Sequence, residues 1–214
     1  GVDAGSKSTV VFGYFTAKSE KDGVVGEGVQ RMWSRKIADL DFVATGNKLN
    51  SQAMAVLKAK PLKENREGIT AILAPSEGSI MLGSLVASAA SGQNVNLRRS
   101  PWTDRVGDKI AHDGLTMFDN GLSEKGLLSS AVDDEGIPTQ TTPLIEDGVL
   151  KTYLYDSYNA YQQDLESTSN GIRRSAREAQ GRFLLSPSCA PTTFEVKPGS
   201  KTLEELIADV EPGL

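Results

Sequence analysis

The chain has 214 residues, a formal net charge of −5, 38% hydrophobic residues and 24% charged residues. These proportions are typical of a globular protein with a sizeable core, and they exclude a disordered or fibrous chain. Basic residues occur in short clusters such as Arg98-Arg99, diluted by nearby acids. The sequence therefore lacks the basic stripe of a nucleic-acid-binding protein.

The single cysteine, Cys189, cannot form an intrachain disulfide, which favours a reducing compartment and a cytoplasmic protein. The longest apolar stretch, around residues 80–90, falls short of the roughly 20 residues that a membrane-spanning helix needs. No signal peptide is visible, so no membrane association is expected. Because the chain begins at Gly1 without a methionine, we expect it to belong to a longer protein.

The first third of the chain predicts two strands and a helix. β-Branched and aromatic residues indicate strands at residues 8–15 and 29–37, separated by a glycine-rich turn that holds Gly23, Gly26 and Gly28. Apolar residues at spacings of three and four predict a helix over residues 38–58, which Pro61 ends. The charged connector at residues 60–67 marks the expected sub-boundary between domains.

Beyond this connector the sequence predicts a buried strand at residues 68–74 and a helix rich in small residues at 79–90. Asp147-Gly148 lies between two apolar runs, which predicts a hairpin with a type I′ turn over residues 141–155. A short helix is expected at residues 157–163, and Thr202 with Glu205 has the spacing of a capping box. Strands and helices do not alternate strictly, so the predicted class is α+β, with mixed or antiparallel sheets and packed helices.

Two apparent motifs carry little chemistry. The first eight residues resemble a phosphate-binding loop, but Ser6 stands where glycine must precede Lys7, so a turn before a strand is the better interpretation. His112 is the only histidine, which excludes a histidine-rich zinc site within this chain. A catalytic pair of Cys189 and His112 stays open as an alternative, although no family signature surrounds the cysteine.

Three consecutive acidic residues, Asp133, Asp134 and Glu135, precede Gly136. They could bind a hard cation through their carboxylate oxygens. Adjacent side chains of an extended segment point to opposite faces, however, so three in a row seldom converge on one ion. We therefore expect a structural turn whose carboxylates accept hydrogen bonds from backbone N–H groups.

The acidic cluster opens a longer pattern that resembles the signature of the TldD/PmbA family, also known as modulators of DNA gyrase or peptidase family U62. The matching residues are Asp133, Asp134, Glu135, Gly136, Pro138, Thr139, Leu144, Ile145, Glu146, Gly148, Leu150, Tyr153, Asp156 and Ala160. The resemblance spans most of residues 1–214 and implies the central and C-terminal-domain part of such a protein. It also implies that an N-terminal domain and the final strands lie outside this chain.

The sequence departs from the zinc-bearing members of this family in the helix after Pro75. TldD-type subunits carry an HExxxH motif there, and its positions fall on Gly83, Ser84 and Ser88. Glycine and serine provide neither an imidazole nor a carboxylate, so these positions cannot bind zinc tightly or activate a water. This pattern resembles the PmbA (TldE) type of subunit. The resemblance implies no catalytic residue, metal ligand or cofactor in this chain, and zinc in a TldD-like partner.

The resemblance thus implies a non-catalytic subunit of a TldD/TldE-like metallopeptidase that acts on small unfolded peptides. Its partner would be a zinc-bearing paralogue, and this chain would supply a wall of the substrate chamber. The alternative is a homodimeric peptide-binding or scaffold protein without peptidase activity.

Overall fold

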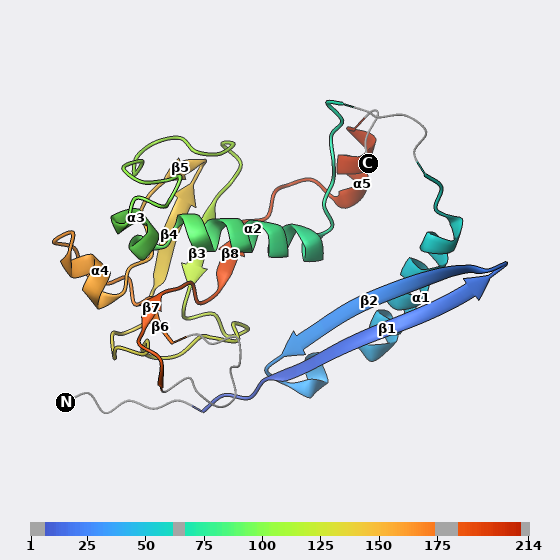
Figure 1. Cartoon of the computed structure of the whole chain (residues 1–214), viewed down its shortest axis with the longest axis horizontal. Coiled ribbons are helices and arrows are strands. Elements are labelled where there is room, and N and C mark those ends of the chain that lie inside the picture. Colours follow the sequence, from blue (N-terminus) through green and yellow to red (C-terminus); the bar gives the residue numbers. More distant parts are fainter. Residues whose placement is uncertain (1–6, 62–66, 174–183, 211–214) are drawn as a thin grey trace. The chain divides into compact units, whose positions relative to one another are not determined.

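We describe a computed structural model of the chain for residues 7–61, 67–173 and 184–210. The chain divides into two compact units, one formed by residues 7–69 and one by the described residues from Thr70 onward (Figure 1). Each unit is described by itself.

The smaller unit is a two-stranded antiparallel ribbon with a helix against one face (Figure 1). Strands β1 (Val11–Lys21) and β2 (Val24–Ser34) pair along their whole lengths, and a short 3-10 helix (Ile37–Asp39) leads to α1 (Phe42–Lys58). Asp22 and Gly23 connect the strands, both with positive φ (51° and 77°). These angles suit a type I′ turn, which matches the twist of the flanking strands.

Gly26 and Gly28 lie within β2, not in the turn, and they allow α1 to approach the ribbon closely. A Cβ atom at Gly26 would overlap the carbonyl oxygen of Ala53, and one at Gly28 would overlap that of Leu49. Leu49 and Ala53 are the buried residues of α1. The expected glycine-rich turn was therefore wrong for these two glycines, which provide a packing surface for the helix.

Four predicted elements of this region differ from the structure. The strands lie at 11–21 and 24–34 instead of 8–15 and 29–37, because the tight Asp22-Gly23 turn lets both strands extend up to it. The helix begins at Phe42 instead of residue 38, where Asp41 accepts a hydrogen bond from the Ala44 N–H. The strand predicted at 68–74 was wrong: it forms no named strand, and Leu73 is 51% exposed. An apolar run becomes a buried strand only where a neighbouring strand and a core receive it.

The larger unit combines one four-stranded sheet, one two-stranded sheet and four helices. Its strands are β3 (Met117–Asn120), β4 (Thr141–Glu146), β5 (Val149–Leu150), β6 (Gly171–Ile172), β7 (Ser188–Cys189) and β8 (Phe194–Val196). Its helices are α2 (Pro75–Ala89), α3 (Gly92–Asn96), α4 (Ser157–Tyr161) and α5 (Leu203–Ala208). The larger sheet has the order β5-β4-β3-β8, β6 pairs with β7, and all these pairs are antiparallel.

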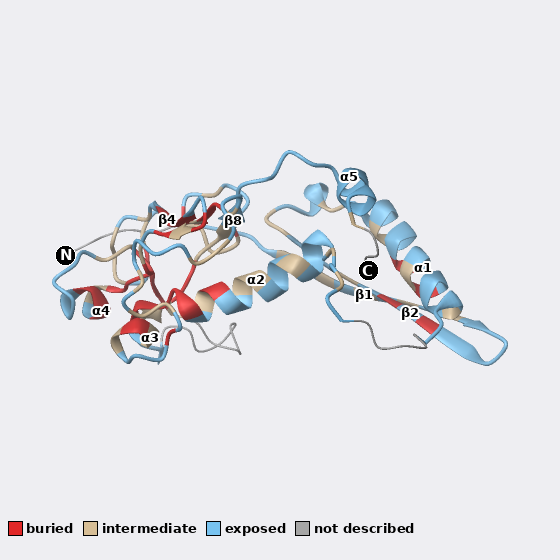
Figure 2. Ribbon diagram, turned by 90° about the horizontal axis from the view of Figure 1, so that it is seen from above, coloured by how far each residue is buried: buried red, intermediate tan, exposed pale blue. Residues whose placement is uncertain are grey.

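Helix α2 packs its C-terminal half on the four-stranded sheet, and its N-terminal half is largely exposed (Figures 1 and 2). Pro75 is its first residue, four residues before the predicted start, since proline has the backbone φ of a first helical turn. The first core cluster joins this helix to the sheet through Val86, Ala90, Met117, Leu144, Ile145 and Leu154. A second cluster comprises Val95, Leu150, Tyr153, Tyr155 and Ala160.

Two local predictions for this unit are confirmed. Asp147 and Gly148 have φ of 49° and 79° between β4 and β5, as a type I′ turn requires. Thr202 and Glu205 form a reciprocal capping box at the start of α5. The antiparallel sheets and packed helices confirm the α+β class. Among the described residues, no helix is both long and apolar enough to cross a membrane.

Candidate functional site

The positions that match the lost HExxxH motif lie on α2 and carry no group suited to zinc. Gly83 has open space around it, and Ser84 is exposed with its hydroxyl donating to the Met81 carbonyl at 3.0 Å. Ser88 is exposed, and its carbonyl accepts a hydrogen bond from the Asn94 amide at 2.9 Å. Glycine and two serines offer no imidazole, thiolate or carboxylate, so this face of α2 does not fit a zinc ion.

The small residues at the motif positions of α2 do not bring another backbone close to the helix in the described part of the chain. A Cβ atom built on Gly83 meets nothing within 4 Å among the described residues. The buried residues of α2 are Val86 and Ala89, whereas Ser84 and Ser88 are exposed. The small residues therefore leave an open helix face.

Cys189 and His112 each form a hydrogen bond with a different backbone group, which does not support a catalytic nucleophile and its base. The Cys189 sulfur accepts a hydrogen bond from the Asp156 N–H at 3.3 Å, and His112 Nδ1 accepts one from the Gly114 N–H at 3.0 Å. The pKa of the Cys189 thiol is raised to about 11, mainly by burial and also by the charge of Asp156, while hydrogen bonds from the backbone of Asp156 and Gln93 act in the opposite direction. A thiol that stays protonated at neutral pH is a weak nucleophile.

The acidic cluster forms a tight loop, which we call the signature loop (residues 133–137). Asp133 is buried, and its Oδ1 accepts hydrogen bonds from the N–H groups of Glu135 and Ile137, both at 2.9 Å. Gly136 has φ of 83°, and its N–H donates to the Asp133 carbonyl at 3.1 Å. The carboxylate of Asp133 thus satisfies the backbone donors that the turn leaves unpaired.

The acidic side chains of the signature loop also bind two other segments of the chain, Asp133 and Asp134 the β6 segment and Glu135 the start of α4. Asp133 Oδ2 accepts from the Gly171 N–H at 3.1 Å, and Asp134 Oδ2 accepts from the Arg173 N–H at 2.7 Å. Glu135 Oε2 accepts from the Ser157 N–H at 2.7 Å, at the start of α4. The carboxylates diverge toward these partners. In the parts of the chain that the structure describes, no group of three His, Cys, Asp or Glu residues could hold a metal ion.

A buried polar pair that the sequence analysis missed lies next to this loop. Asp119 of β3 is 2% exposed, and Asn170, directly before β6, is 1% exposed. Asn170 Nδ2 donates to Asp119 Oδ2 at 2.6 Å. Asp119 Oδ1 accepts from the N–H groups of Thr192 and Thr193, both at 2.8 Å. No local motif marks these residues, since their partners are 51 to 74 positions away in sequence.

Burial raises the pKa of the Asp119 carboxyl above its usual value. The hydrogen bonds from Asn170, Thr193 and Thr192 act in the opposite direction, because they favour the charged carboxylate.

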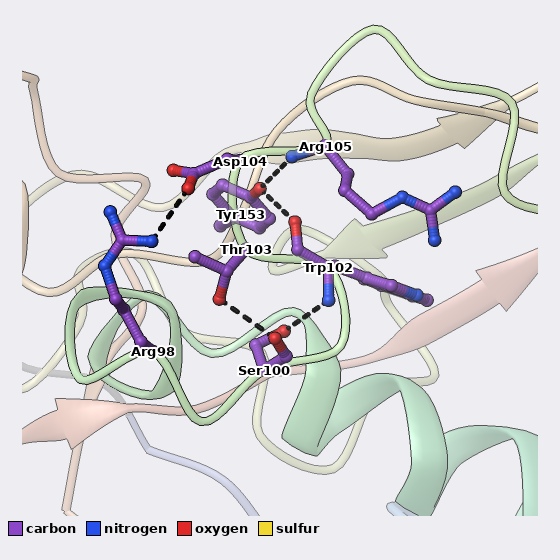
Figure 3. Close-up of polar contacts among 7 residues, drawn as sticks. All are labelled: Arg98, Ser100, Trp102, Thr103, Asp104, Arg105 and Tyr153. Atoms are coloured by element: carbon purple, nitrogen blue, oxygen red, sulfur yellow. Dashed lines mark hydrogen bonds and ion pairs between the residues drawn. The ribbon is translucent and has the colours of Figure 1, made fainter.

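The signature residue Tyr153 contacts the loop before β3, as Figure 3 shows. Its hydroxyl donates to the Trp102 carbonyl and accepts from the Arg105 N–H at 3.2 Å. Ser100 continues this network, since its hydroxyl donates to the Ala89 carbonyl at 2.6 Å and accepts from the Trp102 N–H. These bonds connect the end of α2 to Tyr153, which follows the β4–β5 hairpin.

The α+β fold and the signature loop can be compared with those of known protein families. A profile of the PmbA/TldA metallopeptidase C-terminal domain matches residues 66–214, and the chain belongs to this family. This match confirms the resemblance to the TldD/PmbA family that the signature indicates.

Individual relatives show the same similarity. A metalloprotease of Methanocaldococcus jannaschii is 28% identical over 204 residues, which cover 94% of this chain and 43% of the relative. A metalloprotease PmbA homolog of Buchnera aphidicola is 34% identical over 138 residues, covering 64% of this chain and 30% of the relative. TldE from Thermococcus kodakarensis has a solved structure of the same fold, with a TM-score of 0.75 and 22% identity over 95% of this chain and 44% of that protein. The chain thus spans less than half the length of each of these relatives.

Proposed function

We propose that the protein containing this chain is the non-catalytic subunit of a TldD/TldE-like metallopeptidase that acts on small unfolded peptides. The observation that carries this proposal is the chemistry of α2. Gly83, Ser84 and Ser88 stand at the positions that match HExxxH, and none can bind zinc or act as a general base.

The rest of the described site offers no replacement for this chemistry. Amide hydrolysis needs an activated water or nucleophile, together with groups that stabilise the developing charge. The thiol of Cys189 is held in its protonated form by burial, and the three carboxylates of the signature loop accept hydrogen bonds from backbone N–H groups. The proposal therefore assigns zinc and the general base to a TldD-like paralogue, and a wall of the substrate chamber to this chain. We place the pair in the cytoplasm, in keeping with the single cysteine.

The test is reconstitution of the complete protein with a paralogue that carries HExxxH. Each protein is expressed alone and with the other, and cleavage of an unstructured fluorogenic peptide is followed with and without a zinc chelator. We expect cleavage only by the mixture, and its loss on chelation. Chelator-resistant cleavage by this protein alone would overturn the proposal.

The same experiment distinguishes the alternative of a homodimeric peptide-binding or scaffold protein. In that case the protein would not co-elute with the paralogue, and no mixture would cleave the peptide.

A further inference from the structure

The Asp119–Asn170 pair is buried at the junction of several segments. Asn170 Nδ2 donates to Asp119 at 2.6 Å and to the Ala190 carbonyl at 3.0 Å, so both of its protons are used. Its Oδ1 accepts from the Thr168 hydroxyl at 2.7 Å, and its backbone carbonyl accepts from the Ala190 N–H at 3.0 Å. Asn170 is therefore held from the side of β3, from residue 190 and from its own preceding turn.

Asn170 is joined directly to the residue that holds the signature loop. Gly171 donates its N–H to Asp133 Oδ2 at 3.1 Å, and its carbonyl accepts from the Asp134 N–H at 3.0 Å. A shift of the Asn170 backbone would move both groups of Gly171 together. The position of the signature loop thus depends on how Asn170 is anchored.

We propose that Asp119 and Asn170 are positioning residues, which fix the signature loop (residues 133–137) through Gly171. Neither belongs to the signature pattern, and both act through other residues. Asp119 accepts hydrogen bonds from two segments, from the Asn170 side chain before β6 and from the Thr192 and Thr193 backbone after β7. It therefore locks the segment after β7 and the segment before β6 into one arrangement.

The chemistry of the pair makes it hard to replace. Aspartate at position 170 would set one carboxylate against another and would leave the Ala190 carbonyl without its donor. Alanine at position 170 would remove both donors from buried oxygens, and the cost of an unpaired buried acceptor is high.

The test compares hydrogen exchange in the complete protein and its Asn170→Ala variant. We expect peptides covering residues 133–138 and 170–173 to exchange about tenfold faster or more, since a lost hydrogen bond to a charged group changes a local opening equilibrium by that order. Peptides covering the β4–β5 hairpin should change by about twofold or less. Val95→Ala, a change in the second core cluster, is the matched control, and it should not favour exchange in the signature loop over the hairpin.

Equal acceleration in the loop and the hairpin would mean a general loss of stability and would overturn the proposal. Unchanged exchange in the loop would also overturn it. Asn170→Asp provides a second variant of nearly the same size, for which the same local increase is expected.

The consequence for peptide cleavage rests on the proposed function. In the mixture with the HExxxH paralogue, Asn170→Ala should lower kcat/KM while the two proteins still co-elute. If the unmodified mixture does not cleave the peptide, the proposed function fails, and the exchange measurement still decides the role of Asp119 and Asn170.

Discussion

One residue with an unusual backbone angle, Arg98, shows how a helix ends in this fold. Arg98 has φ of 53° directly after α3, where its N–H and that of Arg99 donate to the carbonyls of Val95 and Asn94 at 2.9 and 2.7 Å. This arrangement is a Schellman motif, in which glycine usually occupies the left-handed position. The Arg98 side chain forms an ion pair with Asp104 at 3.0 Å (Figure 3), and both side chains are more than 70% exposed.

We predict that Arg98→Gly is more stable than Arg98→Ala by about 1 kcal/mol, because only glycine adopts this φ without a steric cost. Both variants lose the exposed ion pair, which contributes little in water, so their difference isolates the backbone term. Urea unfolding of the two variants measures it. Equal midpoints would show that position 98 relaxes out of the left-handed region.

Asp119 gives the fold a specific pH dependence. The pKa of its carboxyl is higher in the folded chain than in the unfolded chain, because burial disfavours the charged form. The folded chain therefore binds this proton more tightly, and the resulting stability is present at low pH and lost as the pH rises through the folded pKa.

We predict that the free energy of unfolding of the wild type, measured relative to Asp119→Asn, decreases as the pH rises from about 4 toward neutrality, since the asparagine does not titrate. Urea unfolding at a series of pH values tests this. The opposite slope would mean that the hydrogen bonds from Asn170, Thr192 and Thr193 outweigh burial.

At the scale of elements, local turn chemistry was readable from the sequence, and packing between elements was not. The Asp147-Gly148 turn and the Thr202–Glu205 capping box follow from residues within a few positions of each other. Asp22-Gly23 carries the same turn signal between β1 and β2, and it would have corrected the strand boundaries. The failed strand at residues 68–74 lacked any such local marker, since a strand depends on a distant partner.

The contact between β2 and α1 gives a prediction for one pair of glycines. Gly28→Ala should destabilise the smaller unit by about 1–3 kcal/mol, because the added methyl overlaps the Leu49 carbonyl and must push the helix away. Gly46→Ala, in open space on the same helix, should stabilise it by about 0.5–1 kcal/mol. Thermal unfolding of both variants provides the comparison. A destabilised Gly46→Ala would show that this helix face is covered.

At the scale of the whole molecule, the signature indicated the family, whereas the arrangement around it needed the structure. The acidic residues of the loop stood out in the sequence, but their partners Gly171, Arg173 and Ser157 lie 22 to 39 positions away. The same distance hid Asp119 and Asn170, which resemble ordinary polar residues when read alone. Long-range hydrogen bonds leave no periodic pattern, so the position of each carboxylate could not be predicted.

The exposed face of α2 gives a prediction for association. Ser84→Leu should leave the melting temperature of the isolated protein nearly unchanged, since exposed substitutions usually alter stability by less than about 0.5 kcal/mol. It should weaken co-elution with the HExxxH paralogue or lower peptide cleavage by the mixture, if this face lines their shared chamber. Ser51→Leu, at an exposed position of α1, is the control and should change neither. A mixture that tolerates Ser84→Leu would remove this face from the chamber.

The long sequence separations between the residues that hold the signature loop and the Asp119–Asn170 pair also affect how the chain folds. Asp119 binds Thr193 across 74 positions and Asn170 across 51, and Asp133 binds Gly171 across 38. Closing such long loops costs chain entropy before any contact compensates for it. These long-range hydrogen bonds therefore form late in folding, and they slow the folding of the chain. The β4–β5 hairpin, by contrast, closes across two residues and can form early. During synthesis the signature loop would therefore stay unformed until residue 193 has left the ribosome, well after its own sequence has emerged.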